Sequence, residues 1–258
     1  MPETFLYNIN AEYIVLFLMF GMFALFALGR RLHMHQKDKI QDLGPLSNFL
    51  FALLGLMMAF TFGMSASRFE TRNAIVIAGT NHIRDAIMRV DLYQDTAIRK
   101  AFKADFQAYV QARIDWSLSK RDLKLAEEAQ KRTKIVADRL LNRAAVLARD
   151  PANLVASQQM IPPLHAMIEI VTLREGATKA IVPEPIIYLL FLMAWISSFM
   201  AGYATNIQKK FNYLAVSGYT ILVGLVIYII LDLDRPRRGL ISNNFVNQFI
   251  VDLLELFK

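Results

Sequence analysis

Four long uncharged stretches dominate the hydrophobic pattern of the chain. Between one charged residue and the next, these stretches run for 17, 25, 24 and 21 residues and are mostly apolar. A helix needs about 20 mostly apolar residues, in a range of roughly 17–25, to cross the hydrocarbon core of a bilayer. A helix buried in a soluble core rarely stays uncharged on every side for so long. The pattern therefore predicts four membrane-spanning helices, at about 12–29, 45–67, 183–206 and 211–231.

A polar insert, residues 68–182, separates the second span from the third and has the periodicity of helices. No part of it alternates strongly between apolar and polar residues, as a half-buried strand would. Apolar residues recur instead at the 3.6-residue period of a helix, in three stripes. The stripes are Ile98, Phe102, Phe106, Tyr109 and Val110; Val136, Leu140, Ala144 and Leu147; and Leu164, Met167, Ile168 and Val171. These stripes predict a helical bundle outside the membrane.

The predicted fold class is all-α, a polytopic membrane protein with four transmembrane helices and a helical extramembrane bundle. We expect residues 1–67 to form a first transmembrane hairpin, 68–182 the extramembrane domain and 183–231 a second hairpin. Residues 232–258 are expected to carry a charged interfacial motif and a C-terminal amphipathic helix.

The composition agrees with a membrane protein and limits its partners. Hydrophobic residues make up 55% of the chain and charged residues 20%, whereas an average soluble domain is about 25% charged. The insert carries 19 lysines and arginines against 13 aspartates and glutamates, which is +6 of the net +7. Because its basic residues are interleaved with acidic ones along every helix, the surface does not favour nucleic-acid binding. The lipid bilayer is the partner that the composition does indicate.

Catalytic and metal-binding signatures are not found in the sequence. There is no glycine-rich phosphate loop, nucleophile elbow or calcium loop. His82 and Asp85 share a helix face, as do His165 and Glu169, but neither pair belongs to a zinc pattern. We therefore expect no enzyme activity, no metal and no cofactor.

The second predicted span carries two neighbouring rows of residues, each with a four-residue spacing. Small residues form one row, which allows a second helix to approach closely. Bulkier apolar residues form most of the other row, and such rows can make a hydrophobic constriction in a pore. The packing ridge is Gly55, Ala59 and Gly63, and the pore-lining neck is Ala52, Leu56, Phe60 and Met64. Plain packing against helices or lipid would explain both rows as well.

Charged residues crowd the chain directly after the second and the fourth spans. Pro236 ends the helical pattern there and Gly239 allows a turn. The charges predict either an interfacial stop signal or an ion-paired collar that joins the membrane part to the insert. The collar residues are Arg68, Glu70, Arg72, Asp232, Asp234, Arg235, Arg237 and Arg238.

Several segments together resemble the bestrophin-like family of bacterial and plant membrane proteins, a domain of unknown function. These segments are Ala59-Phe-Thr-Phe, Ser67-Arg-Phe-Glu-Thr-Arg, Arg89-Val-Asp-Leu and Leu231-Asp-Leu-Asp-Arg-Pro-Arg-Arg-Gly-Leu-Ile. With the order of the helices, the resemblance covers nearly the whole chain.

The family is distantly similar to bestrophins, which are pentameric anion channels with four membrane helices and a helical cytosolic region. The resemblance implies a homo-oligomer, a pentamer by analogy, that conducts inorganic anions across a bacterial inner membrane. It also implies a hydrophobic neck near Ala52, Leu56 and Phe60. The acidic cluster that binds calcium in animal bestrophins has no counterpart in this sequence.

Two points stay open at the level of the sequence. Positive charges in the short links between spans favour an insert outside the cytoplasm, while the resemblance favours a cytoplasmic insert, which we adopt. The competing function is a non-conducting membrane scaffold or sensor whose helical domain binds a protein partner.

Overall fold

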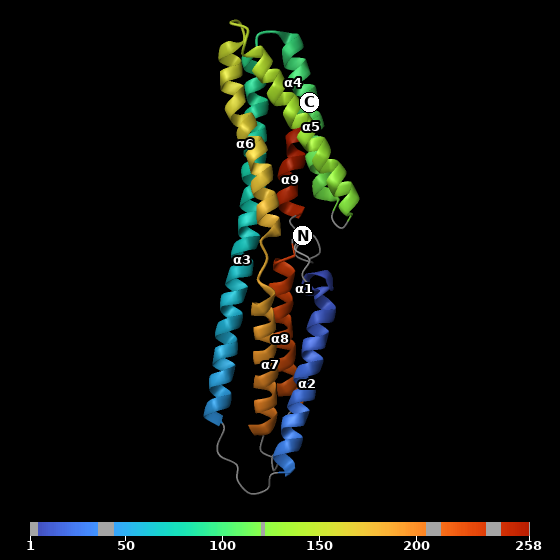
Figure 1. Ribbon diagram of the computed structural model, residues 1–258, viewed down its shortest axis with the longest axis vertical. Coiled ribbons are helices and arrows are strands. Elements are labelled where there is room, and N and C mark those ends of the chain that lie inside the picture. Colours follow the sequence, from blue (N-terminus) through green and yellow to red (C-terminus); the bar gives the residue numbers. More distant parts are fainter. Residues whose placement is uncertain (1–4, 36–43, 120–121, 205–212, 236–243, 258) are drawn as a thin grey trace. The chain divides into compact units, whose positions relative to one another are not determined.

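The structure is a computed structural model that describes residues 5–35, 44–119, 122–204, 213–235 and 244–257. Every regular element among these residues is a helix, so the predicted all-α class is confirmed (Figure 1). The chain divides into two compact units. We call Met1–Phe69 with Ile181–Arg235 the membrane unit, and Glu70–Ala180 with Pro236–Lys258 the extramembrane unit.

The membrane unit contains the apolar helices. They are α1 (Phe5–Asn8), α2 (Ala11–His35), the first part of α3 (Gly44–Met88), α7 (Glu184–Ala204) and α8 (Tyr213–Leu233). Helix α2 packs along both α7 and α8 (Figure 1). Leu18, Met22 and Leu190 are fully buried in the core that results. Four helical segments are long and apolar enough to cross a bilayer, as predicted.

Backbone meets backbone where α2 crosses α7. A Cβ atom added to Gly202 of α7 would collide with the carbonyl oxygen of Phe26, and one added to Gly29 of α2 with the carbonyl oxygen of Phe199. Only glycine permits so close an approach, which strengthens van der Waals packing between membrane helices. Gly202 is also the last of three buried small residues four apart, after Ala194 and Ser198. We call these three residues the α7 ridge. They were not predicted from the sequence to pack against another helix.

Helix α3 runs without a break from Gly44 to Met88, well past the predicted end of the second span at residue 67. Proline, the strongest helix breaker, does not occur between Ser67 and Met88, and alanine and isoleucine are frequent there. Its first part belongs to the membrane unit and its remainder, from Glu70, to the extramembrane unit.

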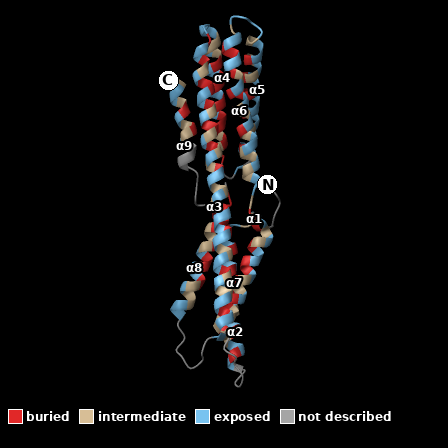
Figure 2. Cartoon of the chain, turned by 90° about the vertical axis from the view of Figure 1, so that its left-hand side faces the viewer, coloured by how far each residue is buried: buried red, intermediate tan, exposed pale blue. Residues whose placement is uncertain are grey.

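The extramembrane unit is a bundle built from the predicted stripes. Its further elements are η1 (Arg89–Leu92), α4 (Thr96–Leu118), α5 (Leu123–Leu147), α6 (Leu154–Lys179), α9 (Asn244–Asp252) and η2 (Leu253–Phe257). Phe102 and Phe106 of α4, Leu140 of α5 and Leu164 of α6 are fully buried in one core. In Figure 2 the buried positions, in red, gather on the sides where these helices face one another.

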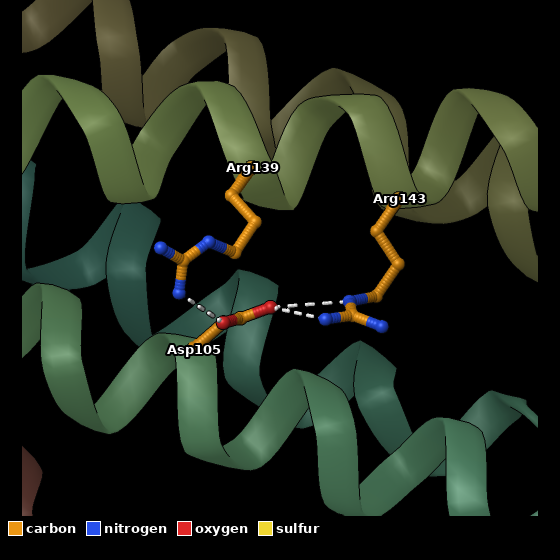
Figure 3. Close-up of polar contacts among 3 residues, drawn as sticks. All are labelled: Asp105, Arg139 and Arg143. Carbon is orange, nitrogen blue, oxygen red and sulfur yellow. Dashed lines mark hydrogen bonds and ion pairs between the residues drawn. The ribbon is translucent and has the colours of Figure 1, made fainter.

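A single carboxylate holds two arginines between α4 and α5. The Oδ2 atom of Asp105 accepts hydrogen bonds from Nε (3.1 Å) and Nη2 (2.7 Å) of Arg143, while its Oδ1 accepts one from Nη1 of Arg139 at 3.3 Å (Figure 3). The Asp105 side chain is buried and both arginines reach it from the next helix. Such a charge-assisted cluster fixes the register of the two helices.

Candidate functional site

One face of the membrane part of α3 packs against its own chain. Leu54 belongs to the core of the membrane unit, and Thr61 and Ser65 are buried on the same side of the helix. The Thr61 hydroxyl donates to the carbonyl oxygen of Met57 at 2.8 Å, so this buried polar group is satisfied within the helix. Phe51 meets the ring of Tyr219 on α8 edge to face. This face anchors α3 to the protomer.

The predicted neck lies on the opposite face of α3. Leu54 and Leu56 are two residues apart, which turns the side chain by about 200° around a helix of 3.6 residues per turn. Leu56 is 52% exposed and Phe60 is 65% exposed, and Ala52 and Met64 are exposed as well. This row is thus an unpartnered apolar face of the single chain, not part of its core.

The predicted packing ridge borders the neck and is equally open. A Cβ atom added to Gly55 or Gly63 would meet nothing within 4 Å, and Ala59 is exposed. Gly55 and Gly63 therefore have open space beside them in the single chain. The packing ridge contrasts in this respect with the α7 ridge.

A buried polar cluster lies where α8 ends. Asp234 has a side chain that is only 1% exposed, and its Oδ2 accepts hydrogen bonds from the Tyr7 hydroxyl (2.5 Å) and the Val182 backbone N–H (2.6 Å). Its Oδ1 lies 3.6 Å from Nη1 of Arg68 on α3, an ion pair without a hydrogen bond. One carboxylate thus connects residues from α1, from α3 and from the segment before α7.

Two further contacts tie the N-terminal residues into this cluster. Nη2 of Arg235 donates to the carbonyl oxygen of Leu6 at 2.9 Å, and its guanidinium lies over the Tyr7 ring. The backbone N–H of Leu6 donates to the carboxylate of Glu184 at 2.8 Å. Burial raises the pKa of the Tyr7 hydroxyl, and its hydrogen bond to Asp234 acts in the same direction. Tyr7 is therefore a neutral donor to a carboxylate.

The structure places only part of the predicted collar in this cluster. Arg68, Asp234 and Arg235 meet there, and Asp232 is buried two residues before Asp234. Glu70 and Arg72 belong to the extramembrane unit, where Glu70 is exposed and Arg72 is buried. Arg237 and Arg238 lie outside the described residues.

Sequence reasoning missed the partners that Asp234 finds. Tyr7 and Val182 are 227 and 52 residues away along the chain, and neither stands in a motif. A lone tyrosine before a span and a valine between spans give no local signal. Among the described residues, no group of three or more histidine, aspartate or glutamate side chains comes together as a metal site.

Comparison with known proteins identifies the architecture. No protein-family model matches the sequence, and no curated protein matches it. Solved structures do match. A crystal structure of a bacterial bestrophin homologue from Klebsiella pneumoniae, phased with zinc, aligns over 95% of this chain and 97% of its own, with a TM-score of 0.67 and 12% identity. The fold is that of the bacterial bestrophin homologues.

Two variants of the Klebsiella pneumoniae homologue give the same result. A tryptophan-to-alanine variant aligns over 96% of this chain and 98% of its own with a TM-score of 0.70 and 12% identity. An isoleucine-to-threonine variant covers 94% and 98% with a TM-score of 0.67 and 13% identity. Similarity at this level of identity establishes the bestrophin fold and not the activity. Among the described residues, the chain combines this fold with four helices that are long and apolar enough to cross a membrane.

Proposed function

We propose that this protein is a homo-oligomeric ion channel whose narrow part is formed by the neck residues of α3. The observation that carries the proposal is the exposed apolar row of α3, on the side away from the face that anchors the helix to its own protomer. Beside it lies a ridge of small residues that is open in the single chain. The bestrophin fold supports the same conclusion, because the sequence resemblance implies a pentamer with a hydrophobic neck in this position.

In a ring of subunits, the two rows of α3 take different tasks. The ridge of Gly55, Ala59 and Gly63 lets a helix of the neighbouring subunit approach closely. The neck row then faces the axis. Leu56 and Phe60 are one helical turn apart, about 6 Å along the axis at a rise of 1.5 Å per residue. They contribute two successive hydrophobic layers, which stop ions by excluding water until the ring widens.

Inorganic anions are the proposed permeant ions. The segment 68–182 has a net charge of +6, and a net positive charge raises the local concentration of anions. We also propose that Asp234 fixes the orientation of α3 through Arg68, because this ion pair adds a directional contact to the apolar packing of Leu54.

Current recording from purified protein in planar bilayers tests this function. We expect discrete current steps, with a reversal potential in a potassium chloride gradient near that of chloride. Native mass measurement should give a multiple of the 29.4 kDa chain, five in a pentamer. A reversal potential near that of potassium would overturn anion selectivity alone. Silent bilayers that contain well-assembled protein would favour the scaffold or sensor.

The extramembrane unit is proposed to face the cytoplasm of a bacterial cell, from the inner membrane. The chain has no native cysteine, so one cysteine placed at exposed Glu128 of α5 reports on this side alone. We expect it to resist membrane-impermeant thiol reagents in intact cells and to react after permeabilisation. A cysteine at Lys209, in the link between α7 and α8, is the matched control and should label in intact cells. The reverse pattern would place the unit outside.

A further inference from the structure

A buried arginine without a counter-charge lies inside the extramembrane unit. Arg113 of α4 is 2% exposed, and its Nε and Nη1 atoms have no hydrogen-bond partner among the described residues. A guanidinium group keeps its charge at every relevant pH, so burial cannot be relieved by deprotonation. An unpaired buried charge is strongly destabilising. The Arg113 guanidinium therefore needs a partner other than the described residues of the chain.

A second arginine lies beside the same indole ring. The guanidinium of Arg113 lies 5.2 Å from the centroid of the Trp116 ring, and that of Arg174 on α6 lies 4.0 Å from it. Both groups also act on the hydroxyl of Tyr109, whose pKa is raised by burial and lowered by these two charges. Cation–π contact with the indole only partly offsets the desolvation of the Arg113 guanidinium.

Nearby carboxylates of the chain are engaged elsewhere. Asp115 pairs with Arg132 at 3.1 Å and accepts a hydrogen bond from Gln111 at 3.0 Å. Glu175, next to Arg174 in sequence, accepts a hydrogen bond from Gln130 on α5. Neither carboxylate forms an ion pair with Arg113 in the part of the chain that the structure describes. Two turns earlier on α4, Asp105 shows the usual arrangement, because its buried charge has two arginine partners.

We propose that a small inorganic anion of halide size binds in the extramembrane unit between Arg113, Arg174 and Trp116. Trp116 is 8% exposed and Tyr109 is fully buried, so a ligand that reaches the Arg113 guanidinium between them has to be small. A carboxylate from a second copy of the chain would need Arg113 at the surface. The site lies outside the membrane unit, so the inference does not depend on conduction through the neck.

Gly79 of α3 offers a way to replace the ion. A Cβ atom built on Gly79 would lie 3.9 Å from Nη2 of Arg113 and 3.3 Å from Cγ2 of Ile170. In Gly79→Asp, after a small movement of the Ile170 side chain, a carboxylate faces Arg113 from within the chain. Gly176→Asp is the matched control, since a Cβ atom added there meets nothing within 4 Å.

Thermal unfolding of the purified full chain in detergent tests the site. The Tm is measured in chloride or bromide against gluconate, at constant ionic strength. Above the dissociation constant, each tenfold rise in halide should raise the Tm of the native protein by about 3–5 °C. Gly79→Asp should lose this response and be more stable than the native protein in gluconate. Gly176→Asp should respond to halide as the native protein does.

Fluorescence of Trp116 gives an independent readout of occupancy. The chain has two tryptophans, so in Trp195→Phe the fluorescence excited selectively from tryptophan comes from Trp116 alone. Quenching by iodide should saturate with concentration, whereas collisional quenching of an exposed indole rises linearly. Arg113→Gln should abolish the saturable part, with a Tm in gluconate equal to or above that of the native protein. Arg113→Gln decides the matter if Gly79→Asp does not fold.

Three results would overturn the proposal. One is a native Tm that is the same in chloride and gluconate, with linear iodide quenching. Another is loss of the halide response in Gly176→Asp as well as in Gly79→Asp, which would indicate a general charge effect. The third is a native protein whose Tm does not respond to halide, together with dissociation of the oligomer in Arg113→Gln, which would assign the counter-charge to a carboxylate of a second copy.

Discussion

The same four-residue spacing of small residues occurs on α7 and on α3, with opposite outcomes in the single chain. On α7, Ala194, Ser198 and Gly202 are buried, and Gly202 meets the backbone of α2. On α3, Gly55 and Gly63 have open space beside them. The spacing marks a helix face that another helix can approach closely. Whether the approaching helix belongs to the same chain depends on contacts that the spacing does not encode.

Gly202→Val should have the largest effect, because the α7 ridge is already packed against α2 and leaves no space for a side chain. Its Cβ atom would overlap the carbonyl oxygen of Phe26, and backbone atoms cannot move aside as a flexible side chain can. We expect little or no folded protein by size-exclusion chromatography after extraction. Gly218→Val on α8, where an added Cβ meets nothing within 4 Å, is the control and should be extracted like the native protein. Equal yields of both would contradict a tight α2–α7 crossing.

Asp234→Asn should come next, because it removes a buried charge that holds α3 to the membrane unit. Losing one partner of a buried pair typically costs 3–5 kcal/mol, and we expect about 3 kcal/mol because Arg68 is 28% exposed. Thermal unfolding in detergent measures the loss. Arg68→Gln should cost less, since Asp234 keeps its hydrogen bonds from Tyr7 and Val182. A larger loss in Arg68→Gln than in Asp234→Asn would contradict this ranking.

Ala59→Leu should leave the protomer intact and disrupt its assembly. The added bulk lies on the open ridge, so the Tm of the protomer should change little, while neighbouring helices that pack on the ridge are pushed apart. The native mass in mild detergent should fall to that of one chain. Ala24→Leu, an exposed alanine on α2, serves as the control. An unchanged mass for Ala59→Leu would mean that the ridge faces lipid.

Tyr7→Phe should have the smallest effect, through loss of the hydrogen bond to Asp234. One such bond to a charged group contributes about 1.5–3 kcal/mol. The pKa of Tyr7 is raised in the folded state, so its stabilisation is fully present below pH 10, the ordinary pKa of tyrosine, and declines as the pH rises further. The difference in Tm between native protein and Tyr7→Phe should be constant from pH 7 to pH 9 and shrink above pH 10. A difference that grows above pH 10 would have the wrong sign.

Local patterns in the sequence were sufficient to predict the helices of the chain and the core residues of the extramembrane unit. Phe102 and Phe106, predicted from the 3.6-residue period, are fully buried, because an apolar stripe on a helix has to be covered. The burial of Gly202 and the partners of Asp234 could not be predicted. Both depend on contacts between residues far apart in the sequence, such as the hydrogen bond from Tyr7 to Asp234, which are 227 residues apart. Arg113 likewise looked like one more basic residue among interleaved acids, since burial is set by the tertiary fold.

The double variant Leu56→Ala with Phe60→Ala tests the central claim most directly. Removing both bulky side chains keeps the helix, because alanine is the best helix former, and widens the two layers of the neck. Leu16→Ala with Phe20→Ala on α2 is matched in residue type, spacing and exposure, at 60% and 73%. Single-channel conductance in planar bilayers should rise with weaker gating in the α3 variant and stay native in the α2 variant. Two results would contradict a pore lined by α3. One is an α3 variant that assembles well but shows only the conductance of empty membrane, and the other is an equal change of conductance in both variants.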